Sequence, residues 1–224
     1  MVRTGAIGEW AAPISAGATW LEAQRLVAAK QWRNENSVQS LAQLTQVVEA
    51  YEKVDAEFGI KNLRWVVHHV PEVNVDLLSR LKALGVGVEM AAFRWVTSNK
   101  PNEVVGPQFR TIVDHGIQCG IHGDGVHIAP LNPWSHIQYA VTGINSFGDQ
   151  VNPGQHLTRQ EALRLFTREN AWFMKMEDKI GSIEVGKLGD LVVLDRDYFA
   201  IPETDIRNVR SQMTIVGGKI VHGA

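Results

Sequence analysis

The sequence predicts an α/β protein that ends in a small β element. Between about residues 60 and 145, short runs rich in β-branched and aromatic residues alternate with amphipathic helical segments, a pattern typical of parallel βα units. After residue 176 the helical spacing is replaced by apolar segments that glycines interrupt, which favours strands. We therefore expect two parts, residues 1–175 and residues 176–224.

Helices are predicted where apolar residues recur at steps of three and four. After a loop over residues 1–18, they are expected at 19–28, 38–54, 75–84, 108–114, 133–141 and from 159 onward. Asn36 or Ser37 is placed to cap the second of these helices, and Asn74 the third. Thr158 and Glu161 form a capping box, in which each side chain satisfies a backbone donor at the helix start.

Strands are predicted where β-branched and aromatic residues form compact runs. They are expected at Leu63–Val70, Val86–Met90 and Ile117–His122, and within Gly181–Leu194 and Met213–His222. Glycines 217 and 218 are placed to turn the chain inside the last segment. The short polar segment Arg33–Ser37 separates the first two helices.

The composition is that of an ordinary globular protein and gives no argument for a nucleic-acid or membrane partner. Lys and Arg total 22 against 24 for Asp and Glu, so no strong charge would attract a polyanion. Cys119 is the single cysteine, which excludes a disulfide within the chain; we expect a buried thiol and a cytoplasmic protein. Glu9 interrupts the first apolar stretch, which argues against a signal peptide.

Two histidines, His68 and His69, close the strand predicted at Leu63–Val70. Neighbouring residues of a strand point to opposite faces, so we expect only one imidazole to face the interior of the fold. The alternative is that one histidine packs against a helix while the other lies on the surface.

A second group of polar residues follows the strand predicted at Ile117–His122. His122 and Asp124 are two positions apart and would share a face if the strand continues that far. Functional residues of parallel α/β folds gather at the carboxyl ends of strands. An aspartate there can ligate a divalent metal and accept a proton from water. A plain Asp-Gly turn is the alternative.

The C-terminal part carries the most specific pattern of the sequence. The segment Gly181–Asp195 (GSIEVGKLGDLVVLD) closely resembles a signature of the amidohydrolase superfamily, and Met213–Val221 resembles its closing hairpin. Asn132-Pro133-Trp134 is similar to the branch called amidohydrolase family 3, which includes proteins like N-substituted formamide deformylase. The resemblance covers nearly the whole chain but matches only the C-terminal portion of that family.

This resemblance implies a fold, a chemistry and a set of site residues. The fold is a partial (β/α)8 TIM-type barrel, made of the later strands and helices, beside part of a small β-sandwich. Asp124 matches the aspartate after the last barrel strand, a metal ligand and catalytic acid–base. His69 matches a metal-binding histidine, with His68 as the competing choice. The resemblance gives His122 no fixed role, and we expect it, together with His68, to line the pocket and bind substrate.

The chain also departs from the family pattern. The His-x-His pair of the first barrel strand is absent, no histidine lies near 34–37, and Glu9 only roughly occupies the place of a fourth-strand ligand. Our first hypothesis is a hydrolase of non-peptide C–N bonds that uses a divalent metal, zinc foremost, on a small amide-type substrate. The second is a non-catalytic subunit that covers its strand edges by self-association or with a partner chain. The third is a sequence truncated upstream.

Overall fold

The computed structural model describes residues 5–9 and 12–223. They form two compact units, which we describe separately. The first comprises the described residues up to Ala91 together with Val105–Gly120, and the second comprises Ala92–Val104 and the described residues from Ile121 onward. The boundary falls inside strand β4 (Cys119–His122), so this strand is common to both.

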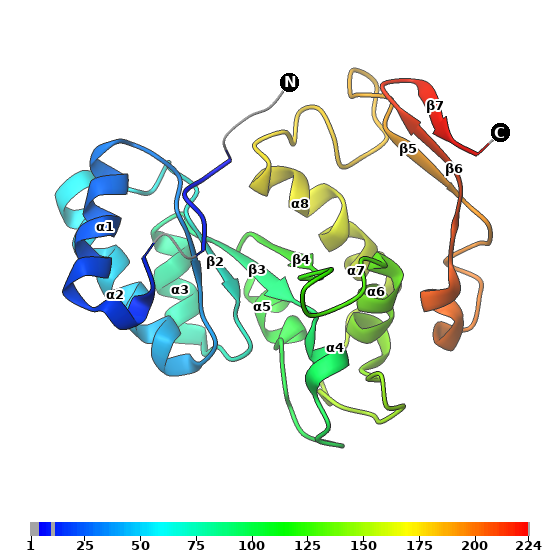
Figure 1. The fold of residues 1–224 in the computed structure, drawn as a ribbon, viewed down its shortest axis with the longest axis horizontal. Helices are drawn as coiled ribbons and strands as arrows, with labels where there is room; N and C mark the ends of the chain where they lie inside the picture. The colour runs from blue at the N-terminus through cyan, green and yellow to red at the C-terminus, as the bar shows by residue number, and fades with distance from the viewer. Residues whose placement is uncertain (1–4, 10–11, 224) are drawn as a thin grey trace. The chain divides into compact units, whose positions relative to one another are not determined.

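The first unit is built on a sheet whose strands follow one another in chain order, β1-β2-β3-β4 (Figure 1). Strand β2 pairs in parallel with both β1 and β3, which confirms the predicted parallel βα units. The bounds are Glu35–Ser37 for β1, Val66–His69 for β2, Gly87–Ala91 for β3, Ala18–Ala29 for α1, Leu41–Phe58 for α2, Val75–Ala83 for α3 and Phe109–His115 for α5. A single turn of 3-10 helix, η1 (Ile14–Ala16), interrupts the expected N-terminal loop.

Helix α2 starts later than predicted. Ser40 caps it by accepting a hydrogen bond from the Gln43 backbone N–H at 3.3 Å, so the expected cap at Asn36 or Ser37 is wrong. Asn74 does cap α3 as predicted, by accepting from the Leu77 N–H at 2.8 Å. The buried side of α2 is apolar and packs towards the sheet; it consists of Leu44, Val47, Val48, Ala50, Tyr51 and Val54.

Strand β1 occupies the polar segment in which we predicted no strand. Asn36 accepts a hydrogen bond from Trp20 Nε1 at 2.9 Å and donates to Gln24 Oε1 at 2.9 Å and to the Tyr51 hydroxyl at 2.7 Å. A buried amide is tolerated when its hydrogen-bonding groups find partners. This network lets a polar strand lie under α1 and α2.

The second unit contains α4 (Arg94–Thr97), α6 (Pro133–Thr142), α7 (Arg159–Phe166), α8 (Arg168–Phe173) and η2 (Glu203–Asn208). The capping box of Thr158 and Glu161 opens α7 as predicted. One continuous helix was expected after it, but Thr167 leaves helical geometry with φ −122° and ψ −83° and separates α7 from α8. Thr167 is therefore both the C-cap of α7 and the N-cap of α8, and the helical periodicity does not continue across it.

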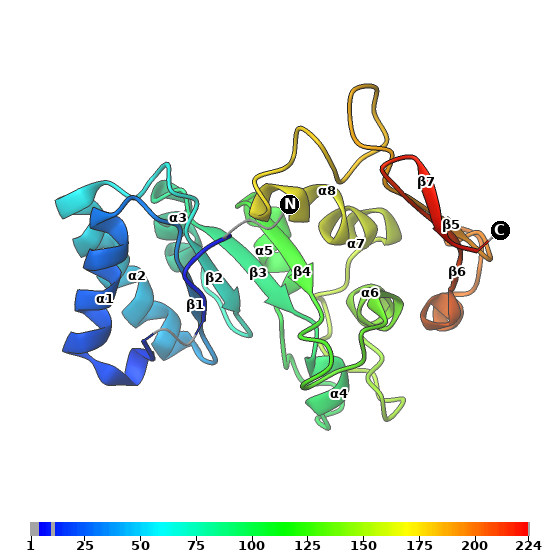
Figure 2. The same ribbon diagram turned by 45° about the horizontal axis from the view of Figure 1, so that its top comes forward.

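The C-terminal sheet has three antiparallel strands in the order β5-β6-β7 (Figure 2). They are β5 (Leu191–Leu194), β6 (Ser211–Val216) and β7 (Lys219–His222), and the Gly217-Gly218 turn is confirmed. Residues 181–190 are not a strand; they form a loop in which Gly189 O accepts from the Gly218 N–H at 2.9 Å. Every residue of these strands is exposed or half-buried.

Two further expectations concern burial and length. Cys119 is a buried free thiol, as predicted. Within the part of the chain that the structure describes, no helix combines the length and apolarity that crossing a bilayer requires.

Candidate metal centre

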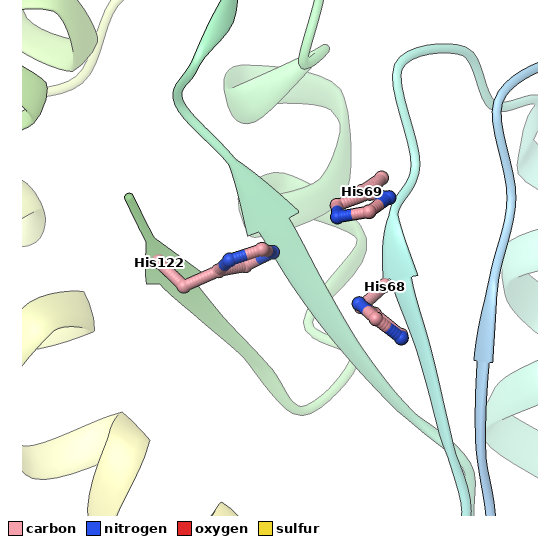
Figure 3. Close-up of side chains that lie close together, drawn as sticks. All are labelled: His68, His69 and His122. Carbon is pink, nitrogen blue, oxygen red and sulfur yellow. The ribbon is translucent and has the colours of Figure 1, made fainter. Parts of the chain in front are cut away.

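Three imidazoles gather at the carboxyl end of the four-stranded sheet (Figure 3). His68 and His69 end β2, and His122 ends β4; β3 lies between these strands in the sheet. One potential ligand nitrogen from each histidine lies within 4.8 Å of the other two. The ends of β2 and β4, which the sequence predicted separately, therefore lie close together. They lie at the carboxyl end of the sheet, where parallel α/β folds place functional residues.

The expectation that only one of His68 and His69 faces this side is wrong. Their ring centroids are 4.7 Å apart, and both side chains are buried. The reason is that the regular pleat ends at His69, whose φ is +71°, followed by Val70 with φ +32°. This left-handed backbone turns the second imidazole towards the first, and such strain in non-glycine residues is often found at functional sites.

The His69 imidazole is held through its Nδ1 atom. Ser37 Oγ lies 2.7 Å from this nitrogen and Gln39 Nε2 lies 2.6 Å from it, and Gln39 also donates to Ser37 Oγ at 3.3 Å. A histidine that binds a metal commonly uses one ring nitrogen for the ion and the other for a polar neighbour that fixes the ring. For Nε2 to bind a metal, Nδ1 must carry the proton and donate it to Ser37 Oγ.

Glu9 approaches the same histidine from the strand-like segment next to β1. Ile7 forms a parallel bridge with Asn34, so the chain at Ile7 runs beside β1, and Glu9 follows two residues later. Its Oε1 atom is 3.7 Å from His69 Nδ1, and its side chain is 28% exposed. The carboxylate therefore stands at the rim of the cluster, at a distance suited to an ion pair with a protonated imidazole.

Glu89 adds a carboxyl group to the same face of the sheet. Ser37, His68 and Glu89 are partners in parallel register, so their side chains share one face. Burial raises the pKa of Glu89 to about 7, Glu35 adds repulsion, and Arg33 acts in the opposite direction. Glu89 therefore adds a carboxyl group with a raised pKa to the face of the sheet that carries His68.

Asp124 lies just past the end of β4, in a loop rather than in a continued strand. Its φ is +50° and its side chain is half-buried. The cluster formed by the described histidines, cysteines and acidic residues contains His68, His69 and His122 but not Asp124. Its assignment as a metal ligand and catalytic residue stays a prediction.

Ser37 and Gln39 were missed at the sequence level because the polar stretch around them showed no strand pattern. One signal was available: two consecutive helices of a βα array need a strand between them, and polar residues at the end of that strand would face the site. Here that strand is β1, and Ser37 is its last residue.

The donor set of the three histidines suits a transition metal. Three imidazoles with an open fourth position are a known ligand set of catalytic zinc, in which bound nitrogens lie about 3.4 Å apart. The histidine nitrogens already lie within 4.8 Å of one another, so small side-chain shifts would bring them to that spacing. The residues present therefore fit a divalent metal of the zinc type.

A family model described as "Amidohydrolase family" matches residues 22–222 of the chain. The chain belongs to the amidohydrolase family. This confirms the resemblance seen in the C-terminal signature and in the family 3 motifs.

Several relatives of this amidohydrolase-family chain are known. It is 26% identical over 165 residues to YtcJ of Bacillus subtilis (strain 168), whose name assigns it to the amidohydrolases; the match covers 69% of this chain and 31% of YtcJ. It is 25% identical over 182 residues to N-substituted formamide deformylase of Arthrobacter pascens, covering 77% of this chain and 33% of the relative. The chain thus spans about a third of these relatives.

Solved structures agree on the fold. A zinc-bound adenosine deaminase of Xanthomonas campestris superposes with a TM-score of 0.65 at 17% identity, over 92% of this chain and 49% of the deaminase. At this identity the similarity shows the fold alone.

Proposed function

We propose that this amidohydrolase-family chain forms the histidine side of a metal centre that hydrolyses a non-peptide C–N bond. The observation that carries the proposal is the convergence of His68, His69 and His122 at the carboxyl end of one sheet. The chain-order arrangement of β1 to β4 supports a wall of a (β/α)8-type barrel, since each strand lies beside the next strand in sequence.

A divalent metal, with zinc as the first choice, would polarise a substrate carbonyl and lower the pKa of water when bound at this centre. His68, His69 and His122 would hold it, and Ser37 would fix the His69 ring through Nδ1. Asp124, just past the end of β4, would receive the proton of the attacking water and pass it to the leaving nitrogen. We also propose that His68 and His122 contact the substrate, as their place in the cluster would allow.

The substrate class follows from the relatives rather than from the pocket. The name of one relative specifies N-substituted formamides, which are amides of formic acid. The near-zero net charge of this chain provides no strong field to select a charged substrate. We therefore propose a small amide-type substrate.

Metal analysis of the purified chain tests the proposal directly. After dialysis with zinc, manganese or iron(II), about one equivalent of metal should remain bound to the wild type, and Co²⁺ should give a ligand-field spectrum of tetrahedral character. The variants His68→Ala, His69→Ala and His122→Ala should each lose most of this binding. His222→Ala, an exposed histidine of β7, is the matched control.

Hydrolysis tests the second half of the proposal. Release of formate or amine from N-substituted formamides should depend on added metal and should drop at least about 100-fold in Asp124→Asn, because general acid–base catalysis supplies roughly that factor. Absence of stoichiometric metal, together with an unchanged rate in Asp124→Asn, would eliminate the catalytic function.

The second candidate is a subunit that acts by associating with another copy or another chain. The exposed apolar residues of β5–β7 favour it: Val193 is 44% exposed, Ile220 57% and Val221 61%. Apolar sheet faces are normally covered. Sedimentation at micromolar concentration should then show a dimer or larger species, and a monomer that stays stable on dilution would remove this candidate.

A further inference from the structure

The loop that follows β4 has an ordered internal structure. The Val126 N–H donates to Ala129 O at 2.8 Å, and Gly125 bridges Ala129. Asp124 and Val126 both have positive φ, +50° and +76°, a conformation that is uncommon for non-glycine residues and most unfavourable for the β-branched Val126. Contacts from outside the loop can offset this unfavourable conformation and help to hold residues 123–130 in this form.

His136 of α6 supplies such a contact at both ends of the loop. Its side chain is 1% exposed, and its Nε2 atom lies 3.1 Å from Pro130 O at the end of the loop. At the start of the loop, a Cβ atom built on Gly123 would lie 2.6 Å from the same Nε2. The edge of the imidazole therefore touches the backbone next to His122 and also binds the carbonyl that closes the loop.

The position of the His136 ring is itself constrained. Trp95 of α4 packs edge-on against it, with centroids 6.1 Å apart and planes at 73°. Burial lowers the pKa of His136, which favours the neutral ring in which Nε2–H donates to Pro130 O. Gly123 is required where it is because any side chain there would occupy the space of the imidazole.

We propose that His136 is a positioning residue that fixes the loop 123–130 and thereby places Asp124 and His122 for the metal centre. The role in the metal centre rests on the proposed function, whereas the effect on the loop does not. His136 acts through the loop backbone and is not itself a ligand.

A double-mutant cycle between Gly123 and His136 tests the contact. In the full chain, amide exchange of Val126 reports the loop, and that of Ala162, which donates to Thr158 O in α7, reports the rest of the unit. Gly123→Ala should speed Val126 exchange roughly fivefold or more, the size of one lost hydrogen bond, and leave Ala162 unchanged. In a His136→Ala background, adding Gly123→Ala should change Val126 exchange less than about twofold.

Two further variants separate positioning from simple packing. His136→Phe keeps a ring but has no donor for Pro130 O, whereas His136→Gln keeps an N–H donor. Val126 exchange should be faster in His136→Phe than in His136→Gln, and the exposed His127→Phe in the same loop should behave as the wild type. The proposal would be overturned if His136→Phe and His136→Gln changed Val126 exchange equally. It would also be overturned if Gly123→Ala still sped Val126 exchange in the His136→Ala background.

Zinc titration then connects the loop to the metal centre. His136→Phe should weaken zinc binding at least about fivefold, by the same lost hydrogen bond, and His136→Gln should weaken it less. If wild-type protein binds no zinc, the proposed function fails while the exchange cycle still decides the role of His136. If zinc binds equally to wild type and His136→Phe, the link from His136 to the metal centre is refuted.

Discussion

The ring centroids of His68 and His69 lie 4.7 Å apart, with the ring planes tilted by 55°, although the two residues are consecutive in one strand. A regular strand would separate them onto opposite faces of the sheet. The left-handed φ of +71° at His69 brings them together, at a conformational cost of about 1–3 kcal/mol. The surrounding structure bears this cost, and Ser37 contacts the resulting His69 ring at Nδ1.

Ser37→Ala should weaken metal binding without destabilising the fold. It removes the hydroxyl that can accept a hydrogen bond from His69 Nδ1–H, whereas Gln39 Nε2 can only donate. Loss of such a group typically lowers metal affinity about 10- to 100-fold. Ser40→Ala, three residues later, is the matched control: it removes the cap of α2 and should cost about 1 kcal/mol of stability with unchanged affinity. Competition titration with a zinc chelator and urea unfolding measure the two quantities. If both variants changed zinc affinity and the free energy of unfolding in the same way, the separate roles of Ser37 and Ser40 would be contradicted.

Glu89 should make the metal-free protein less stable as pH rises. Its pKa is raised from 4.5 to about 7 in the folded chain, so the folded state keeps a proton that the unfolded state releases. Stability contributed by this proton is complete below about pH 4.5 and is lost as pH rises through 7, a change on the order of 3 kcal/mol.

Glu89→Gln removes this titration and should therefore be more stable than the wild type at pH 8. The stability advantage of the variant should shrink as the pH falls towards 5. Urea unfolding in EDTA across this range measures the difference. The exposed Glu72→Gln is the control and should follow the wild-type curve. Wild-type and Glu89→Gln curves that run parallel would show that the carboxyl ionises normally in the fold.

Features with a local cause could be predicted from the sequence. The caps at Asn74 and at Thr158 with Glu161 depend on residues within one helical turn, and both are present. The Gly217-Gly218 turn and the parallel strands likewise follow from short patterns. In each case the residues that decide the structure are neighbours in the chain.

Features that depend on residues far apart in the chain could not be predicted from the sequence. Strand β1 was missed because Asn36 is satisfied by Trp20, Gln24 and Tyr51, which are 12 to 16 positions away. The joint orientation of His68 and His69 depends on a backbone angle that no pattern of residue types encodes. The centre itself brings His122 to His69 across 53 positions, so only the sheet order reveals it.

Asn36→Leu should destabilise the protein by roughly 3 kcal/mol, although it adds an apolar side chain to a buried site. Three hydrogen bonds are lost, and the Trp20 N–H and the Tyr51 hydroxyl remain buried without this partner. The exposed Gln46→Leu in α2 is the control and should change stability by less than about 0.5 kcal/mol. If Asn36→Leu leaves the free energy of unfolding in urea unchanged, apolar packing can replace the hydrogen-bond network.

Gly85 and Gly59 provide a test of close packing that is independent of any metal. Both have a left-handed backbone, with φ of +67° and +68°, so alanine at either position carries a similar strain of about 1–2 kcal/mol. A Cβ on Gly85 would lie 2.1 Å from Lys61 O, whereas a Cβ on Gly59 meets no atom within 4 Å. The carbonyl belongs to the backbone and can yield only if the loop before β2 moves.

Gly85→Ala should therefore cost at least about 2 kcal/mol more than Gly59→Ala, since a steric conflict with the main chain adds to the shared strain. Urea unfolding of both variants in the same buffer isolates the steric part, because the strain cancels in the difference. Equal losses would mean that the loops before β2 and β3 can separate freely. In that case β2 would not be held rigidly enough beside β3 to keep His68 and His69 in a fixed position.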